Sequence, residues 1–161
     1  MRVLIGGGSG FIGSALASHL RSRGDRVTLI SRSPGKDRIT WSALQQMELP
    51  VFDAVVNLAG QHILDPRRRW TEQYKDEVIR SRVDTTRALV EALNNTSTPP
   101  SVFVSTAGKC FYGTSEVGPD HAYPELTEDS EPMGIDFPAE LVAQWEAAAE
   151  GIDSTRIRHA R

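Results

Sequence analysis

Short apolar runs alternate with stretches of helical periodicity along the first part of the chain. Residues 2–6 form an apolar run, and apolar side chains then recur at Ile12, Leu16 and Leu20, the spacing of one helix face. Residues 26–31 form a second, β-branched apolar run of the kind that is buried in parallel sheets. The pattern predicts a strand, a helix and a second strand in direct succession.

The rest of the chain continues this alternation. After a polar loop, the pattern predicts a short helix at 39–47, a strand at 52–60, a long helix at 71–95, a strand at 101–106 and a helix at 138–150. The stretch 108–137 is rich in Pro, Gly and acidic residues, which predicts a functional or poorly ordered loop. Alternating strands and helices favour a parallel sheet with helices on both faces.

The composition is typical of one folded domain. The chain has 161 residues, of which 39% are hydrophobic and 24% charged, close to the globular average. Eighteen Lys and Arg against 21 Asp and Glu give a net charge of −3, too small to draw the whole molecule onto nucleic acid or an anionic membrane. Any partner must therefore be argued from a local site.

Cysteine usage and hydropathy limit the metal chemistry and the compartment. Cys110 is the only cysteine, which excludes an intrachain disulfide and a cysteine-based zinc site, and the four histidines lack metal-ligand spacing. No apolar run approaches the roughly 20 residues that span a bilayer, and the first residues lack a basic leader with a cleavage site. We expect no metal, no membrane span and a cytoplasmic location by default, with an organelle left open.

Three glycines in GGGSGFIG, residues 6–13, give the strongest chemical signal. Gly7, Gly10 and Gly13 recur every third residue at the junction of the first predicted strand and helix. In dinucleotide-binding folds the first such glycine permits a tight turn, the second lets a pyrophosphate approach the backbone, and the third lets helix and strand pack closely. The helix start adds free N–H groups, so the motif predicts a bound dinucleotide rather than a merely flexible turn.

The end of the second predicted strand indicates which dinucleotide binds. An acidic residue at this point holds the ribose 2′-OH of NAD, whereas arginine accommodates the 2′-phosphate of NADP. This chain has no carboxylate there, but it has Arg32 between Ser31 and Ser33, with Lys36 close behind. These residues favour NADP over NAD; the alternative is that Arg32 is a solvated loop residue.

Several motifs together resemble the extended, or epimerase-like, short-chain dehydrogenase/reductases. These are GGGSGFIG, NLAG at 57–60 and the strand VFVST. RITW, RRW at 68–70 and QWEAAA at 144–149 make the chain similar to the atypical sugar-nucleotide-epimerase-like branch, which includes proteins labelled cell-division inhibitors and NADP-dependent oxidoreductases without an assigned substrate. We therefore expect an α/β fold, a doubly wound Rossmann sheet of strand order 3-2-1-4-5, with NADP across the carboxyl ends of its strands.

The resemblance implies cofactor contacts from twelve residues. The pyrophosphate would be met by Gly7, Gly10, Phe11, Ile12 and Gly13, and the adenosine phosphate by Ser31 and Arg32. The cofactor channel would be lined by Leu58, Ala59 and Gly60, and the cofactor would be contacted or framed by Glu77 and Arg82. Because Glu77 and Arg82 are five residues apart, the alternative is that each is a surface charge on a solvated helix.

The catalytic positions depart from the family. Its usual chemistry uses a Tyr-x-x-x-Lys pair after the fifth strand, in which the tyrosine acts as acid or base and the lysine lowers the pKa of that tyrosine. Phe137 and Leu141 stand at those positions, so no proton and no charge are supplied there. The catalytic residues are therefore unknown.

Other side chains near the expected site each have an equally simple structural explanation. Ser105 and Thr106 end a strand where open α/β sheets place ligands, but satisfaction of backbone groups explains them as well. Tyr112 fits packing better than proton transfer, and Cys110 lacks a histidine base near it in sequence. His62 after NLAG is either a cofactor neighbour or an exposed loop residue.

Length is the other departure from the family, whose members continue with a complete sixth strand and a region that forms most of the substrate cleft. We expect residues 1–151 to form the NADP-binding domain and residues 152–161 the truncated start of the sixth strand, with the substrate region missing. The strand at 101–106, which is the fifth in the family's order, would then present an open apolar edge. The chain is read as a truncated or alternatively spliced product, or as a fragment.

The expected function is that of an NADP-binding domain from an oxidoreductase that acts on a small carbonyl or a sugar nucleotide, with the shortened chain inactive by itself. The alternative is a non-catalytic NADP(H) sensor or protein-interaction module, which the missing tyrosine and lysine favour. A homo-oligomer is compatible with both.

Residues 67–69, three consecutive arginines, are either an anion-binding patch or solvated residues before a helix on which Trp70 packs. Nucleic-acid binding through them is weakly supported because the chain is acidic and lacks a stacking platform.

Overall fold

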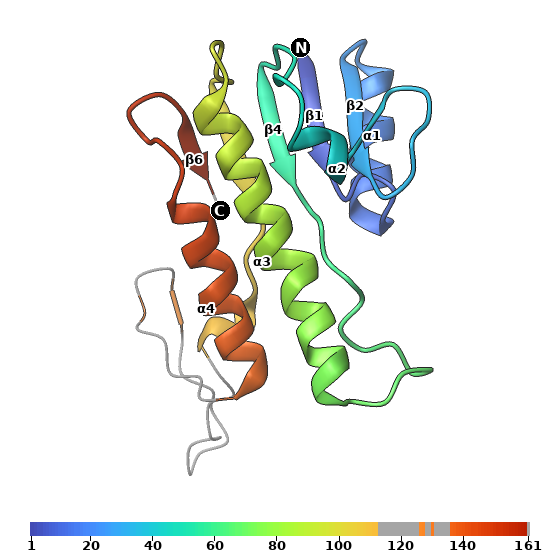
Figure 1. The fold of residues 1–161 in the computed structure, drawn as a ribbon, viewed down its shortest axis with the longest axis vertical. Coiled ribbons are helices and arrows are strands. Elements are labelled where there is room, and N and C mark those ends of the chain that lie inside the picture. The colour runs from blue at the N-terminus through green and yellow to red at the C-terminus, as the bar shows by residue number, and fades with distance from the viewer. Residues whose placement is uncertain (113–125, 128–129, 131–135, 161) are drawn as a thin grey trace.

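A computed structural model describes residues 1–112, 126–127, 130 and 136–160 (Figure 1). Most of the stretch for which the sequence predicts a functional or poorly ordered loop, 108–137, lies outside these described residues. Within them, a parallel sheet and four α-helices alternate along the chain, as the hydrophobic pattern predicts.

All six strands pair in parallel in the order β3-β2-β1-β4-β5-β6. The strands are β1 (Arg2–Gly6), β2 (Arg26–Ser31), β3 (Arg38–Thr40), β4 (Ala54–Asn57), β5 (Val102–Ser105) and β6 (Arg158–Ala160). The expected order 3-2-1-4-5 and the Rossmann-type fold are confirmed, and β6 extends the sheet by one strand.

Strand β3 corrects one local prediction. Residues 39–47 were expected to form only a short helix, but the chain pairs with β2 through Arg38–Thr40 before the helix begins. Thr40 then caps that helix, because its Oγ1 accepts a hydrogen bond from the backbone N–H of Ala43 at 3.1 Å. Three residues are too few to show the alternation by which a strand is recognised in sequence.

The helices are α1 (Phe11–Ser22), α2 (Trp41–Leu44), α3 (Glu72–Asn95) and α4 (Phe137–Glu150), with a 3-10 turn η1 at Lys109–Tyr112. Thr71 caps α3 by accepting from the N–H of Tyr74, and Asp136 caps α4 by accepting from that of Ala139. Across the described part of the chain, none of the helices combines the length and the hydropathy that a membrane crossing requires.

The helices form two unequal layers. On one face of the sheet, α3 supplies Leu89 and Leu93 to a core that includes Val55 of β4 and Phe103 of β5. On the other face, α1 packs on β1 and β2. Figure 1 shows α3 and α4 side by side, and α1 next to β2.

A buried polar contact joins the sheet to both long helices. Asn57, at the end of β4, is fully buried and donates from Nδ2 to the Oγ1 of Thr86 at 2.8 Å. The indole N–H of Trp145 on α4 donates to the same oxygen at 3.0 Å. Asn57 also accepts from the N–H of Ala59 at 3.1 Å, so its side chain fixes the residues that follow β4.

The expectation that the fifth strand, β5, has an open edge is wrong, because β6 pairs with β5 along that edge. Phe103 pairs with His159, and the two rings stack with centroids 5.3 Å apart. The Oγ of Ser105 lies 2.7 Å from the Nε2 of His159. Three residues of β6 are therefore enough to occupy the edge of β5.

Candidate dinucleotide-binding site

The turn between β1 and α1 has the geometry expected of its first glycine. Gly7 has φ +72°, a left-handed conformation, and a Cβ atom there would lie 2.5 Å from the carbonyl oxygen of Leu58. The N–H of Gly10 donates to the carbonyl oxygen of Gly7 at 3.0 Å and closes the turn. Only glycine fits at position 7.

The other two glycines of the repeat differ in the space around them. A Cβ atom on Gly13 would overlap the backbone of Gly7 and Gly8, so its absence lets α1 pack against the turn. A Cβ atom on Gly10 would meet only the carbonyl oxygen of Gly7, at 3.3 Å. The backbone at Gly10 is thus open to a ligand, whereas the backbone at Gly13 is closed by packing.

The start of α1 is exposed and has the features of an anion site. Gly10 is the N-cap residue and has no side chain to accept from the N–H groups of the first turn, and that turn contains no acidic residue. Phe11 is 93% exposed and Ile12 64%, although both are apolar. The free N–H groups of the first turn and the exposed side chains of Phe11 and Ile12 therefore lie together beside Gly10.

Two further glycines contribute to this turn, and sequence reasoning did not assign them a role. A Cβ atom on Gly8 would overlap the side chain of Leu29 on β2, and one on Gly6 would lie 2.9 Å from the Oδ1 of Asn57. Both residues therefore allow close packing beneath the turn. The run of three consecutive glycines was the signal that could have identified them.

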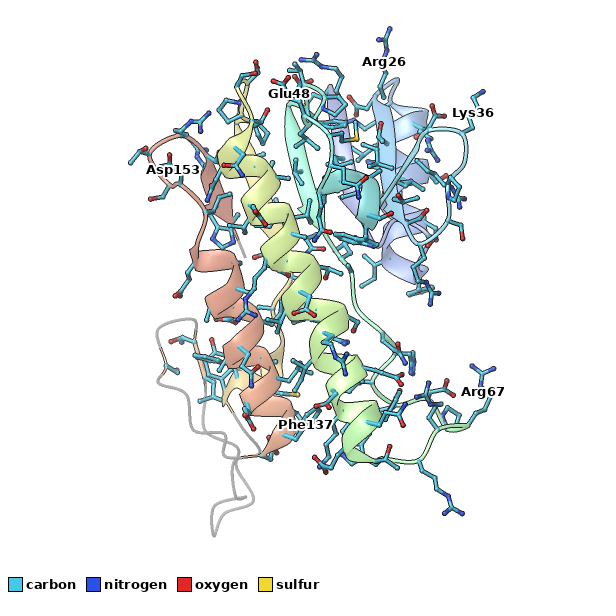
Figure 2. The ribbon with its side chains drawn as sticks, in the orientation of Figure 1. Arg26, Lys36, Glu48, Arg67, Phe137 and Asp153 are labelled. Carbon is cyan, nitrogen blue, oxygen red and sulfur yellow. The ribbon has the colours of Figure 1, made fainter. Side chains whose placement is uncertain are left out.

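The end of β2 presents one arginine to solvent. Ser31 is buried, and its hydroxyl donates to the carbonyl oxygen of Ser33, so it shapes the loop. Arg32 is exposed and has no hydrogen bond or ion pair within the described ranges. Lys36 extends away from the sheet in Figure 2. The loop therefore offers a guanidinium group with no carboxylate partner.

The residues that follow β4 are held against α3. The N–H of Gln61 donates to the Oγ of Ser81 at 2.9 Å, and its carbonyl oxygen accepts from Nη2 of Arg82 at 2.9 Å. The amide of Gln61 lies 3.5 Å from the carboxylate of Glu77. Glu77 and Arg82 thus both contact Gln61, although they are five positions apart on α3.

Arg82 is not the solvated surface charge that the sequence left open. Its guanidinium lies over the ring of Trp145, with 5.4 Å from Cζ to the centroid, and a Cβ atom on Gly60 would be 3.0 Å from that Cζ. Burial lowers the pKa of Arg82 below its ordinary value. The charge is held next to Gly60, the last residue of the expected cofactor channel.

Within the channel segment itself, Leu58 is half-buried, Ala59 is 6% exposed and Gly60 is exposed. The N–H of Leu58 donates to the carbonyl oxygen of Gly6 at 2.9 Å, which continues the sheet pairing beyond β4. The segment therefore begins directly beside the glycine turn. The structure thus brings the predicted residues of the glycine turn and those of the channel segment to the same edge of the sheet.

The arginine run before α3 is largely occupied by contacts within the chain. Arg68 donates to Glu77 at 2.8 Å and lies over the ring of Tyr74, 4.6 Å from its centroid. Arg67 pairs with Asp65 at 3.0 Å, and its hydrogen bonds lower the pKa of that carboxyl. Trp70 packs edge-on against Tyr74. These contacts fit the reading of the run as residues that precede a helix.

The residues at the family's tyrosine and lysine positions belong to packing contacts. Phe137 begins α4, at its lower end in Figure 2, and its ring packs edge-on against Trp70 with centroids 5.3 Å apart. Leu141 is 2% exposed and clusters with Tyr74 and Val78 of α3. Leu141 thus packs at the contact between α3 and α4, and Phe137 packs against the residue that precedes α3 by two positions.

The other side chains that the sequence offers as candidates for the site have contacts that explain them structurally, and none of these contacts indicates catalysis. Ser105 is 4% exposed and bonded to His159, and the hydroxyl of Thr106 donates to the carbonyl oxygen of Asn57 at 3.1 Å. Cys110 and Tyr112 are half-buried in η1, where Tyr112 packs edge-on against Phe111. His62 is exposed, and its carbonyl oxygen accepts from the hydroxyl of Tyr74.

Comparison with known proteins places this arrangement among dinucleotide-binding proteins. Residues 3–135 match the sequence profile of the NAD dependent epimerase/dehydratase family. The chain is 48% identical over 157 residues to the human epimerase family protein SDR39U1, a match that covers 97% of this chain and 52% of that protein. A 48% match over 149 residues to the mouse protein covers 92% and 49%. The chain thus spans about half the length of these relatives.

Solved structures show the same likeness. A crystal structure of human epimerase family protein SDR39U1 (isoform2) with NADPH superposes with a TM-score of 0.90 at 45% identity, over 99% of this chain and 52% of that one. A nucleoside-diphosphate sugar epimerase from Corynebacterium glutamicum gives a TM-score of 0.73 at 27% identity, over 100% and 33%.

Proposed function

Since this chain belongs to the NAD dependent epimerase/dehydratase family, we propose that it binds NADP(H) across the carboxyl ends of β1, β2 and β4. The geometry of the glycine turn is the observation that carries this proposal. Gly7 and Gly13 are required by backbone conformation and packing, whereas Gly10 leaves the backbone open beside an uncapped helix start. That combination suits a pyrophosphate, which needs close approach and N–H donors.

Arg32 decides between the two dinucleotides in this proposal. Its guanidinium has no carboxylate partner and can form a forked, charge-assisted contact with the 2′-phosphate of NADP. The human relative at 45% identity was crystallised with NADPH, which supports the same preference. The pyrophosphate contacts are assigned to Gly7, Gly10, Phe11, Ile12 and Gly13, and the adenosine-phosphate contacts to Ser31 and Arg32.

At the other end of the cofactor, Leu58, Ala59 and Gly60 line the channel, while Glu77 and Arg82 frame it by holding Gln61. NADPH, when bound, supplies a hydride from its nicotinamide ring. The chain's own residues bind and orient that ring, and residues 1–151 form the binding domain that β6 extends.

For the longer relatives and for any longer form of this protein, we propose an oxidoreductase that acts on a small carbonyl or a sugar nucleotide. Hydride transfer to a carbonyl also needs a proton donor near the oxygen. Phe137 and Leu141 cannot supply one, because neither side chain carries an ionisable proton, and both pack against other apolar side chains. By itself the 161-residue chain is therefore expected to bind NADPH without turnover.

The absence of a tyrosine at position 137 and of a lysine at position 141 favours a second candidate function, a non-catalytic NADP(H) sensor or protein-interaction module. Calorimetric titration with NADPH and NADH tests cofactor binding, and equal affinities or no binding would contradict the first proposal. NADPH oxidation against a panel of carbonyl compounds then separates the candidates for a longer form. Turnover there supports the oxidoreductase, whereas tight binding without turnover across the panel supports the sensor.

A further inference from the structure

The loop that leads from β2 to β3 is exposed and basic. Every residue from 32 to 38 is exposed. Among the described residues, the side chains of Arg32, Lys36 and Arg38 have no hydrogen-bond or ion-pair partner. Asp37 is the one acidic residue of the loop. Three cationic groups and a single carboxylate therefore leave the loop with a positive charge that its own contacts do not neutralise.

Backbone contacts fix the position of this loop at both of its ends. The hydroxyl of Ser31 donates to the carbonyl oxygen of Ser33, which holds the backbone of Ser33 beside the end of β2. The N–H of Arg38 donates to the carbonyl oxygen of Gly35 at 3.2 Å, and the chain then pairs with β2 from Arg38 onward. A group attached to the Ser33 side chain is therefore held next to Arg32.

Ser33 has the features of an acceptor for phosphorylation. Its side chain is exposed, and its hydroxyl has no hydrogen-bond partner in the part of the chain that the structure describes. Pro34 follows it and disfavours helical backbone at Ser33. An exposed serine before a proline is the pattern that proline-directed protein kinases modify. Nearby basic side chains stabilise the product, because a phosphoserine carries about −1.5 to −2 charges at pH 7.

We propose that Ser33 is a phosphorylation site whose phosphoryl group takes the place of the 2′-phosphate of NADP on Arg32. This inference rests on the proposed function, in which Arg32 binds that 2′-phosphate. In the modification, Oγ of Ser33 bonds to the γ-phosphorus of ATP, the bond from that phosphorus to the bridging oxygen breaks, ADP leaves, and the hydroxyl proton passes to a base of the kinase. Phosphoserine and the 2′-phosphate are both phosphate monoesters, so they compete for one guanidinium. NADH lacks the 2′-phosphate and does not compete.

Calorimetric titration with NADPH and NADH, before and after treatment with a proline-directed kinase and ATP, tests this inference, and mass spectrometry locates the phosphate. We expect phosphate on Ser33, a loss of NADPH affinity of at least about tenfold, a change in NADH affinity of less than about threefold, and recovery after phosphatase treatment. Thr98 also precedes a proline, so the same treatment is applied to Ser33→Ala. Treated and untreated Ser33→Ala should bind NADPH equally, whether or not Thr98 is modified.

Ser33→Glu supplies a fixed negative charge without a kinase and should also weaken NADPH binding more than NADH binding. Ser154→Glu adds the same charge at an exposed position before β6, at the far edge of the sheet from β3, and should change neither affinity. The inference is overturned by the absence of phosphate on Ser33, by NADPH affinity that this phosphate leaves unchanged, or by equal effects of Ser33→Glu and Ser154→Glu. The proposed function then still stands if the unmodified chain prefers NADPH. Equal NADPH and NADH affinities of the unmodified chain would contradict both.

Discussion

Nη2 of Arg82 donates to the carbonyl oxygen of Gln61 at 2.9 Å, which ties a charged group of α3 to the residue that follows the expected cofactor channel. Arg82→Met keeps much of the side-chain volume but removes this bond. We expect NADPH affinity to fall roughly tenfold, because a hydrogen bond to a charged group contributes about 1.5 kcal/mol. Arg80→Met, on the exposed side of the same helix, is the control. Unchanged affinity in Arg82→Met would contradict the framing role.

The glycine turn allows folding and binding to be separated. Gly10→Val adds a branched side chain where space is open, so the protein should fold and lose dinucleotide binding. Gly13→Ala adds a methyl group against the backbone of Gly7, so it should lower the melting temperature even without ligand. Calorimetry and thermal unfolding of both variants check this. A folded Gly10→Val protein that still binds NADPH would show that the ligand approaches elsewhere.

Arg32→Ala tests cofactor choice. If Arg32 pairs with the 2′-phosphate, NADPH binding should weaken by roughly 10- to 150-fold, equivalent to about 1.5–3 kcal/mol, while NADH binding stays nearly unchanged. Arg26→Ala removes an exposed arginine from the opposite end of β2 and should alter neither affinity. If Arg32→Ala and Arg26→Ala weakened NADPH binding by similar factors, binding would depend on overall positive charge and not on Arg32 in particular.

Thr86 accepts two buried hydrogen bonds through one oxygen, so Thr86→Val should destabilise the fold. The substitution keeps the shape but leaves the donors of Asn57 and Trp145 without their partner, at a cost of about 2 kcal/mol or more. Thr85→Val is the matched control, because the Thr85 hydroxyl bonds only to carbonyl oxygens of its own helix. Urea unfolding measures both. Equal losses of unfolding free energy in Thr86→Val and Thr85→Val would show that the oxygen shared by Asn57 and Trp145 contributes no more to stability than a hydroxyl bonded within its own helix.

Asp37 is the one non-glycine residue with positive φ, 54°, in the described part of the chain. Asp37→Gly should therefore stabilise the protein by up to about 1 kcal/mol in urea unfolding, since glycine adopts this conformation without strain. Glu91→Gly, at an exposed position within α3, should have the opposite sign because it loses helix propensity. Destabilisation by Asp37→Gly would mean that the aspartate side chain supports the turn.

The parts of the structure predicted correctly from sequence depend on local constraints. The spacing of Gly7, Gly10 and Gly13 encodes backbone conformation and close approach, which act over a few residues. The bond of Arg82 to Gln61 spans 21 positions and that of Ser105 to His159 spans 54, so no local pattern reveals either. The tyrosine and lysine positions were located by resemblance, but their burial against Tyr74 and Trp70 required the structure.

The oxygen shared by Asn57 and Trp145 has a consequence for how the helices can move. Apolar surfaces of α3 and the sheet would tolerate sliding, since one aliphatic contact resembles the next. A shift of α3 by one turn, about 5.4 Å, would carry Thr86 away from both donors at once and leave two N–H groups unpaired in the interior. A single hydroxyl therefore selects one alignment of α3, α4 and β4 from several that packing alone would permit.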